Sequence, residues 1–371
     1  MKAKMTRAVA LITFVWLAVA GLTLAQDAKP AKPRAIFLAI PPHSYGSVAP
    51  SAKHLTQWTY SFKYQGLIYT PVIVGTDPRH TNVTTSTPVF IIPIKMIFGK
   101  SNGNRTFDPN NDIYPGTKLT VTQYIAQSPI FAPINFTRGG INLGTTQYED
   151  AYERGSLWKY VKTNNKYHVL LSEPTILPEQ TIKVAPGQGS VRQNPYGHGK
   201  VGFYGADLLD PQLQTYIGKL KQIQPDTLPL FLTYDVYLGC GSDCAVGGYH
   251  SAISPQPNGQ TYSFAAVIDP DAFAADIGAL SHEVGEWMVD PFVDNQCACG
   301  GLMEVGDPLE TEPNYGYFPY TGSNGLSYHP QDLVFINYFG APRNTSLKNW
   351  FTFQDETNVT APCDRGSERM P

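Results

Sequence analysis

His282 and Glu286 have the residue types and the spacing of two ligands of one metal ion. They lie in the segment Ser281-His-Glu-Val-Gly-Glu-Trp-Met-Val-Asp290. On a helix, residues i and i+4 project from the same side, so an imidazole and a carboxylate at this spacing can bind the same ion. A merely solvated helix face would usually carry Lys or Arg among its acids, and this segment has neither. The pattern therefore predicts a metal site on this helix.

The segment resembles the active-site helix of the zincin metallopeptidases, which reads His-Glu-x-x-His. The resemblance covers about residues 260–310. It implies that His282 is the first metal ligand and that Glu283 is the catalytic base that activates metal-bound water. Glu286 departs from the family, which has His at this position; it keeps a metal donor but changes the donor set. Residues 280–292 and 303–308 also resemble a group of uncharacterised exported bacterial proteins, which implies no activity.

A third ligand is needed, and two residues compete for the role, of which Glu304 is preferred and His250 is the alternative. Glu304 follows Glu286 by 18 residues, and the gluzincin branch of the zincins supplies a Glu at such a distance. One His with two carboxylates would suit harder ions such as Mn²⁺ or Ca²⁺ as well as Zn²⁺. His250 would instead restore the two-His, one-carboxylate set of catalytic zinc. Asp290 continues the row of His282 at i+8, either as a carboxylate that hydrogen-bonds to a metal-binding imidazole and holds it in place, or as a plain helix-end carboxylate.

Further oxygen ligands follow in loops and would suit structural Ca²⁺, although they match no EF-hand spacing. They are Asp294, Asn295, Asp307, Glu310 and Glu312. Candidate oxyanion donors are Tyr249, Tyr315 and Tyr317.

The helix that holds these groups is expected over 271–290. Asp269-Pro270-Asp271 offers a capping Asp and a Pro for the first turn, and Pro291 would end the helix. Apolar residues at three- and four-residue spacing predict the face that packs on the core. They are Phe273, Ile277, Leu280, Val284, Trp287 and Met288. Ala275, Ala279, His282 and Glu286 share the opposite face.

The rest of the chain predicts an α+β fold, with a strand-rich N-terminal half and a mixed sheet covered by the 271–290 helix. Strands are expected at 35–40, 59–64, 67–74, 89–97, 118–124, 168–171, 228–238 and 262–268, and further helices at 148–161 and 211–221. A Gly- and Pro-rich stretch at 185–205 is typical of a long loop or domain seam. We expect a strand-rich region at 26–200 and a metal-binding region at 201–371, or one continuous domain over 34–371.

Charge is divided unevenly along the chain. Between Gln222 and Pro342 there are fifteen carboxylates and no Lys or Arg, whereas the remainder has a net charge of +12. Either the acidic part docks on the basic part, or bound cations neutralise some of its carboxylates. The absence of a basic cluster or a nucleic-acid module argues against nucleic-acid binding.

The first 25 residues have the pattern of a signal peptide, with Lys2, Lys4 and Arg7 before an apolar run and cleavage after Ala25. We expect a secreted or periplasmic protein that has no membrane segment after cleavage. Export permits disulfides among its five cysteines. The favoured pairs are Cys240 with Cys244, and Cys297 or Cys299 with Cys363.

Two functions from different classes fit these features. The first is a zincin-like metallohydrolase that cleaves a peptide or protein substrate with metal-activated water. The second is a non-catalytic, calcium-stabilised secreted protein that binds a partner or a glycan. A glycosidase is disfavoured because Glu283 and Glu286 lie three apart on one helix rather than across a cleft, and a Gly-x-Ser-x-Gly serine hydrolase motif is absent. The sequence does not predict the oligomeric state.

Overall fold

The computed structural model describes residues 34–46, 51–64, 67–138, 141–240, 244–296, 301–309, 319–336, 350–351 and 353. They fall within one compact unit, Pro33–Pro371. The predicted signal peptide lies outside the described residues, as do Cys297, Cys299, Cys363, Glu310, Glu312, Tyr315 and Tyr317. Among the described residues, every helix is too short or too polar to cross a membrane.

A mixed sheet of eleven strands forms the centre of the unit. The main path runs in the order β12-β7-β16-β19-β18-β17-β15-β14, with β1 paired to β18 and both β8 and β13 paired to β7. The strands are β1 (Arg34–Ala39), β7 (Val89–Phe98), β8 (Arg105–Phe107), β12 (Thr175–Ile176), β13 (Gln180–Val184), β14 (Gly189–Gln193), β15 (Lys200–Gly205), β16 (Leu228–Tyr234), β17 (Val236–Gly239), β18 (Cys244–Ala252) and β19 (Thr261–Val267). Strands from both halves of the sequence share this sheet, and the predicted α+β class with a mixed sheet is confirmed.

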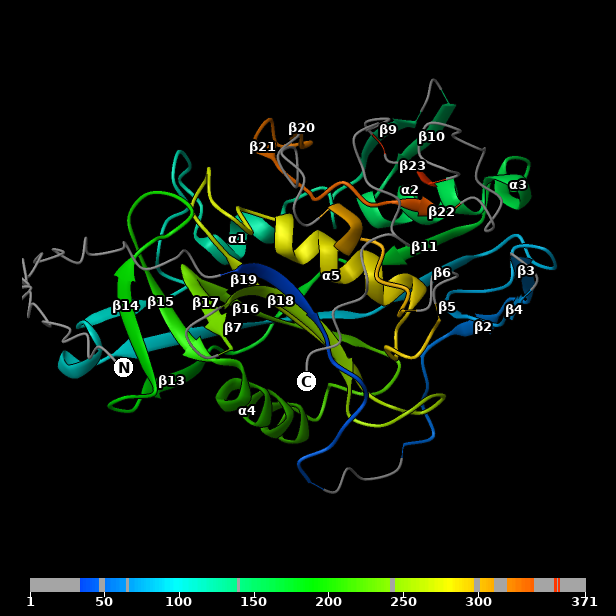
Figure 1. The fold of residues 1–371 in the computed structure, drawn as a ribbon. Coiled ribbons are helices and arrows are strands. Elements are labelled where there is room, and N and C mark those ends of the chain that lie inside the picture. Colours follow the sequence, from blue (N-terminus) through cyan, green and yellow to red (C-terminus); the bar gives the residue numbers. More distant parts are fainter. Residues whose placement is uncertain are drawn as a thin grey trace, which may run out of the picture. The chain divides into compact units, whose positions relative to one another are not determined.

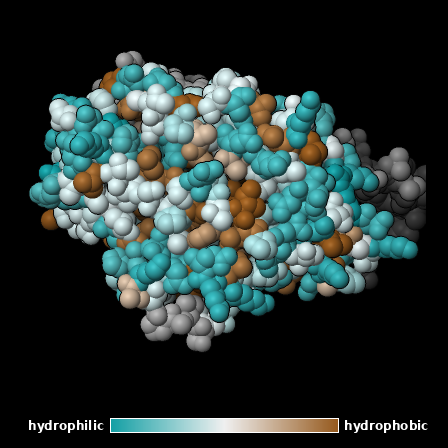
Figure 2. Space-filling view, turned by 180° about the vertical axis from the view of Figure 1, so that it is seen from behind, coloured by the Kyte–Doolittle hydropathy of each residue, from teal (hydrophilic) through white to brown (hydrophobic). Residues whose placement is uncertain are grey.

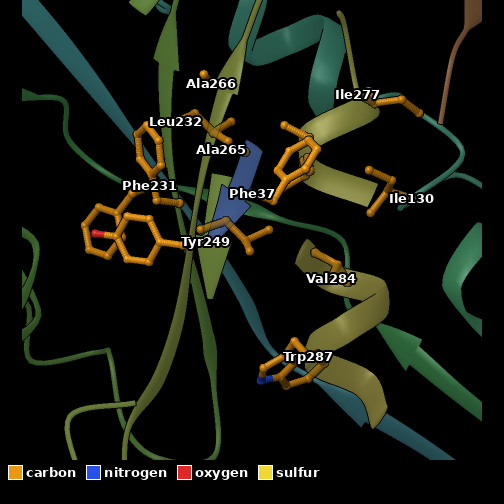
Figure 3. Packing of buried hydrophobic residues seen from close by; sticks show 14 of the residues in the cluster. Phe37, Ile130, Phe231, Leu232, Tyr249, Ala265, Ala266, Ile277, Val284 and Trp287 are labelled. Carbon is orange, nitrogen blue, oxygen red and sulfur yellow. The ribbon is translucent and has the colours of Figure 1, made fainter. Parts of the chain in front are cut away.

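The central strands are covered on both faces. Every residue of β16, β18 and β19 is buried, which is the pattern of strands with helices on either side. Helix α5 (Gly278–Val289) lies along one side of these strands and α4 (Ala206–Lys219) along the other (Figure 1). In Figure 3, Val284 and Trp287 project from α5 toward the strands. The core is therefore built between the sheet and α5.

Successive residues of β18 point to opposite faces, as a pleated strand requires. The Tyr249 hydroxyl donates to Asp210 of α4 at 2.7 Å. The next residue, His250, instead faces α5, where it lies against Glu283. This alternation places one histidine of β18 beside the helix that carries His282.

Helix α5 begins later than predicted. The Asp269-Pro270-Asp271 sequence does not cap it; the chain turns through positive φ angles at Asp271, Ala274 and Asp276 before the helix starts at Gly278. The C-terminal end agrees with the prediction, with Val289 as the last helical residue. All twelve residues of α5 are buried, so the helix has no solvated face and His282 and Glu286 lie inside the protein.

Several local predictions are wrong. The strands expected at 59–64 and 67–74 are interrupted at residues 60–61 and 70–71, and the helix expected at 148–161 is divided at Leu157. The segment at 118–124 contains helix α1 (Val121–Ala126), because Thr120 and Gln123 form a capping box. The predicted loop at 185–205 contains β14 and β15, which pair in the main sheet. The predicted strand at 228–238 is interrupted at Asp235, which has φ of 49° and separates β16 from β17.

Smaller elements surround the central sheet. Two-stranded sheets pair β2 (Gln57–Thr59) with β5 (Val72–Val74), β3 (Phe62–Tyr64) with β4 (Leu67–Tyr69), β6 (Thr84–Thr87) with β11 (His168–Leu171), β9 (Ile134–Arg138) with β10 (Ile141–Thr146), β20 (Tyr320–Thr321) with β21 (Ser327–Tyr328), and β22 (Phe335–Ile336) with β23 (Trp350–Phe351). The short helices are η1 (Lys100–Asn102), α2 (Tyr148–Ser156), α3 (Trp158–Val161) and η2 (Asp307–Leu309). Helix α2 packs against α5.

The face of the molecule in Figure 2 is mainly hydrophilic with scattered hydrophobic groups. A disulfide joins Cys240 and Cys244 beside β18, as the sequence favoured.

Candidate metal centre

Five residues converge at the middle and C-terminal turns of α5. Their ligand atoms form two groups in which all atoms lie within 4.8 Å of one another: His282, Glu286 and Asp307, and His250, Glu286 and Glu304. Glu286 belongs to both groups. The structure thus brings both candidates for the third ligand to the helix, and adds Asp307.

His282 presents one ring nitrogen to the cluster. Its Nε2 lies 3.2 Å from Glu286 Oε2 and 3.4 Å from Asp307 Oδ1, and it has no hydrogen bond of good geometry. Its Nδ1 contacts the Gln331 side-chain oxygen. The orientation of that amide is fixed because Gln331 Nε2 donates to the Gly306 carbonyl at 2.9 Å. Nδ1–H is therefore the donor to Gln331, and Nε2 faces two carboxylates.

His250 is oriented in a similar way. Its Nε2 lies 3.0 Å from the backbone carbonyl of Asp290, which can only accept, so Nε2 carries a hydrogen. Its Nδ1 lies 3.3 Å from Glu283 Oε2 and 3.8 Å from Glu286 Oε2. Metal-binding histidines are commonly held in this manner, with one nitrogen tied to a carbonyl and the other directed at the ion.

The Glu286 carboxylate occupies the centre of the cluster. Its Oε1 accepts from the Gly306 backbone N–H at 2.9 Å, and its Oε2 faces both imidazoles. Burial raises the pKa of Glu286, but the charge of His282 outweighs burial and brings that pKa to about 2. For His282, burial lowers the pKa, and Glu286 and Asp307 raise it well above its ordinary value. The carboxylates thus require a cation at His282 Nε2, which a proton or a metal ion can supply.

The other carboxylates of the cluster are poorly compensated. Both side-chain oxygens of Glu304 are buried and have no hydrogen-bond partner, and burial together with Glu286 raises the pKa of Glu304 well above its usual range. Burial and Glu286 also raise the pKa of Asp307, to about 6. Asp307 is the member nearest to solvent, with 41% of its side chain exposed, whereas His282 and Glu286 are 0% and 2% exposed. Access to the cluster is therefore on the side of Asp307.

Two glycines make room for the cluster. A Cβ on Gly306 would lie 2.2 Å from His282 Nδ1, so only glycine lets this loop approach the ring. A Cβ on Gly248 would lie 2.7 Å from Glu283 Oε1. Glu283 is fully buried and sits between Gly248 of β18 and the His250 ring.

Asp290 holds an imidazole through its backbone rather than its carboxylate. Its carbonyl accepts from His250, while its Oδ1 accepts from the backbone N–H groups of Asp294 and Asn295, both at 3.0 Å. The imidazole held is that of His250, not that of His282.

Two other predicted roles do not fit the structure. Tyr249 cannot serve as an oxyanion donor beside α5, because its hydroxyl lies on the opposite face of the sheet. The calcium ligands predicted in loops do not gather among the described residues: Asp307 faces His282, and the Asn295 amide bonds to backbone atoms of Val72 and Val289.

Several residues of the centre were not predicted. Phe37 of β1 stacks on the His282 ring, with 3.8 Å between ring centroids. Gln331 and Gly306 orient that ring, and Glu149 of α2 packs near it against Gly285. Burial raises the pKa of Glu149 well above its usual range. Phe37, Glu149 and Gln331 lie far from His282 in the sequence, and no local motif connects them to it, so the sequence did not predict their roles.

No family model, curated protein or solved structure matches this chain. The function is therefore inferred from the chemistry of the site.

Proposed function

We propose that the protein is an exported metal-dependent hydrolase whose centre is built on Glu286, His282 and His250. One observation carries the proposal: two buried imidazoles are each tied by one nitrogen to an acceptor, and their other nitrogens both lie within 4 Å of Glu286 Oε2, with Glu283 Oε2 also beside that of His250. Without a proton or a metal ion, the His282 Nε2, His250 Nδ1 and Glu286 Oε2 atoms would be three acceptors that repel one another, and a divalent cation removes that repulsion. The donor set of imidazole and carboxylate suits Zn²⁺ or Mn²⁺.

A divalent metal at such a centre supplies Lewis acidity, which polarises a carbonyl or phosphoryl oxygen and lowers the pKa of water. Glu283 is the residue that we assign to proton transfer. Its carboxylate is buried beside the cluster and lies 3.3 Å from His250 Nδ1, so it can hold a proton within the centre and pass it to a leaving group. The assignment of peptides as the substrate class is based on the zincin resemblance. The assignment of export is based on the signal-peptide pattern.

Metal analysis of the purified secreted protein, combined with hydrolysis of a mixed panel of fluorogenic peptides, tests this function. We expect Zn²⁺ or Mn²⁺ in the wild type. Glu283→Gln should keep the metal and lose about 10²- to 10⁴-fold in turnover, the usual contribution of a general acid or base. His282→Ala should lose both metal and turnover.

Glu153→Gln is the matched control, because Glu153 is a buried carboxylate of α2 that bonds to Tyr167 and lies outside both ligand groups. It should retain both metal and turnover. A protein that holds Ca²⁺ alone, with no hydrolysis, would favour the calcium-stabilised binding protein and contradict the hydrolase.

A further inference from the structure

We propose that the centre holds two divalent cations, with Glu286 as a carboxylate that bridges them. His282 and Asp307 complete the protein ligands of one ion, and His250 and Glu304 complete those of the other. This inference rests on the proposed function and makes it more specific.

The grouping of ligand atoms favours two ions. Ligands of one Zn²⁺ lie about 2.0 to 2.2 Å from it, so they lie at most about 4.4 Å from each other. Each three-residue group spans no more than 4.8 Å, so a side-chain movement of a few tenths of an ångström would let each group bind one ion. The five residues form two such groups, with Glu286 as the shared member. Its Oε2 lies 3.2 Å from the His282 nitrogen and 3.8 Å from the His250 nitrogen, which is the position of a bridge.

Each group also contains a buried atom that makes no hydrogen bond of good geometry. In the first group it is His282 Nε2, on a fully buried side chain, and in the second it is the pair of Glu304 carboxylate oxygens. A buried polar atom without a hydrogen bond costs roughly 1 to 3 kcal/mol, and more for a charged group. A single ion placed in one group would leave the atoms of the other group unsatisfied.

The charges of the cluster also favour two ions over one. Glu286, Glu304 and Asp307 carry three formal negative charges when ionised. Within the part of the chain that the structure describes, no Lys or Arg forms an ion pair with Glu286, Glu304 or Asp307; their basic partners are His250 and His282. One divalent cation leaves one of these negative charges uncompensated, whereas two leave none.

Equilibrium dialysis of the folded, full-length secreted protein against Zn²⁺, and separately against Mn²⁺, tests the proposal. We expect two ions per chain in the wild type and in the Glu153→Gln control. Asp307→Asn should remove the ion held by His282, and Glu304→Gln the ion held by His250, so each should bind one. Glu286→Gln should weaken both.

Electron paramagnetic resonance of the Mn²⁺-loaded protein supplies a second readout, for which the wild-type spectrum is informative by itself. Two bridged Mn²⁺ ions should give an exchange-coupled spectrum in the wild type. Asp307→Asn should give the six-line spectrum of an isolated ion.

The outcomes separate this inference from the proposed function. One ion per wild-type chain, with a six-line spectrum at saturation, would overturn the two-ion centre and leave a mononuclear hydrolase. Two ions that give no exchange coupling would overturn the bridging role of Glu286. A folded wild type that binds neither metal would overturn both proposals.

Discussion

Gln331 determines which nitrogen of His282 faces the carboxylates. It does so from a distant part of the chain, because its amide oxygen accepts from Nδ1 while its amide nitrogen donates to the Gly306 carbonyl. Groups in this position commonly change metal affinity by about 10- to 100-fold when they are replaced.

We therefore expect Gln331→Leu to weaken Zn²⁺ binding by about 10- to 100-fold, because the ring loses its fixed orientation. Competition with a chelating dye measures the change. Gln256→Leu is the control, since Gln256 bonds to Asp294 at the surface and does not contact the cluster. Equal affinity in the two variants would show that Gln331 does not orient the ligand.

A second residue-scale prediction concerns pH and lies away from the metal centre. Asp235 is buried between β16 and β17, and burial together with Asp269 raises its pKa to about 7. The folded protein therefore holds a proton on Asp235 that the unfolded chain, with an ordinary pKa near 4, releases. This group makes the protein less stable as the pH rises from about 4 to 7.

Asp235→Asn should remove that dependence, because Asn tolerates the positive φ at this position and stays neutral. Relative to the wild type, the variant should gain up to about 4 kcal/mol in the free energy of unfolding between pH 4 and pH 8. Urea unfolding at both pH values measures the difference. A constant difference would contradict the raised pKa.

At the scale of elements, α5 is a buried helix whose glycines serve packing rather than flexibility. A Cβ on Gly285 would lie 2.3 Å from the Leu333 side chain and 3.2 Å from Glu149 Oε2. Gly218 of α4 is exposed, and a Cβ there would meet no atom within 4 Å.

A Gly-to-Ala substitution should therefore have opposite effects on stability in the two helices. Gly285→Ala should destabilise the protein by about 1 to 3 kcal/mol, since overpacking in the core outweighs helix propensity. Gly218→Ala should stabilise it by about 1 kcal/mol, because Ala favours the helix and meets no obstacle. Thermal unfolding compares them, and a gain in stability for Gly285→Ala would show that this part of the core is loosely packed.

The sequence predicts the candidate metal ligands of α5 better than it predicts the residues at which the helix begins and ends. The i, i+4 spacing of His282 and Glu286 depends only on helical geometry, and the apolar stripe depends only on periodicity. The start of the helix depends on backbone conformations after Asp269 that the local capping pattern does not reveal. The prediction therefore began the helix seven residues too early.

Strand β18 shows why His250 was harder to place. Gly247 and Gly248 within it are typical of a turn, so the segment was not predicted as a strand. They are tolerated because Phe37, Phe273 and Glu283 pack where side chains would lie. Such close packing is a tertiary property, and without it the sequence could name His250 as a ligand only by its residue type.

At the scale of the whole molecule, the acidic segment of residues 222–342 is partly explained by the centre. Glu283, Glu286, Glu304 and Asp307 all belong to it, and they lie around the side chains of His250 and His282. Lys53 pairs with Asp226 at the surface, 3.2 Å away, so docking of basic residues also contributes. Exposed pairs of this kind add little stability.

Metal removal should therefore destabilise the whole protein. A ligand that binds only the folded state and is present at 100 times its Kd adds about 2.7 kcal/mol. A strong chelator should lower the Tm of the wild type, and added Zn²⁺ or Mn²⁺ should restore it. The Tm of Glu286→Gln should not respond to either treatment, and an equal response would place the stabilising metal elsewhere.

Anomalous X-ray scattering from crystals of the Zn²⁺-loaded protein would locate the metal ions themselves. We predict anomalous density within ligand distance of Glu286 Oε2, flanked by the ring nitrogens of His282 and His250. Density elsewhere in the protein, with the Glu286 carboxylate held only by hydrogen bonds, would contradict a metal centre on α5.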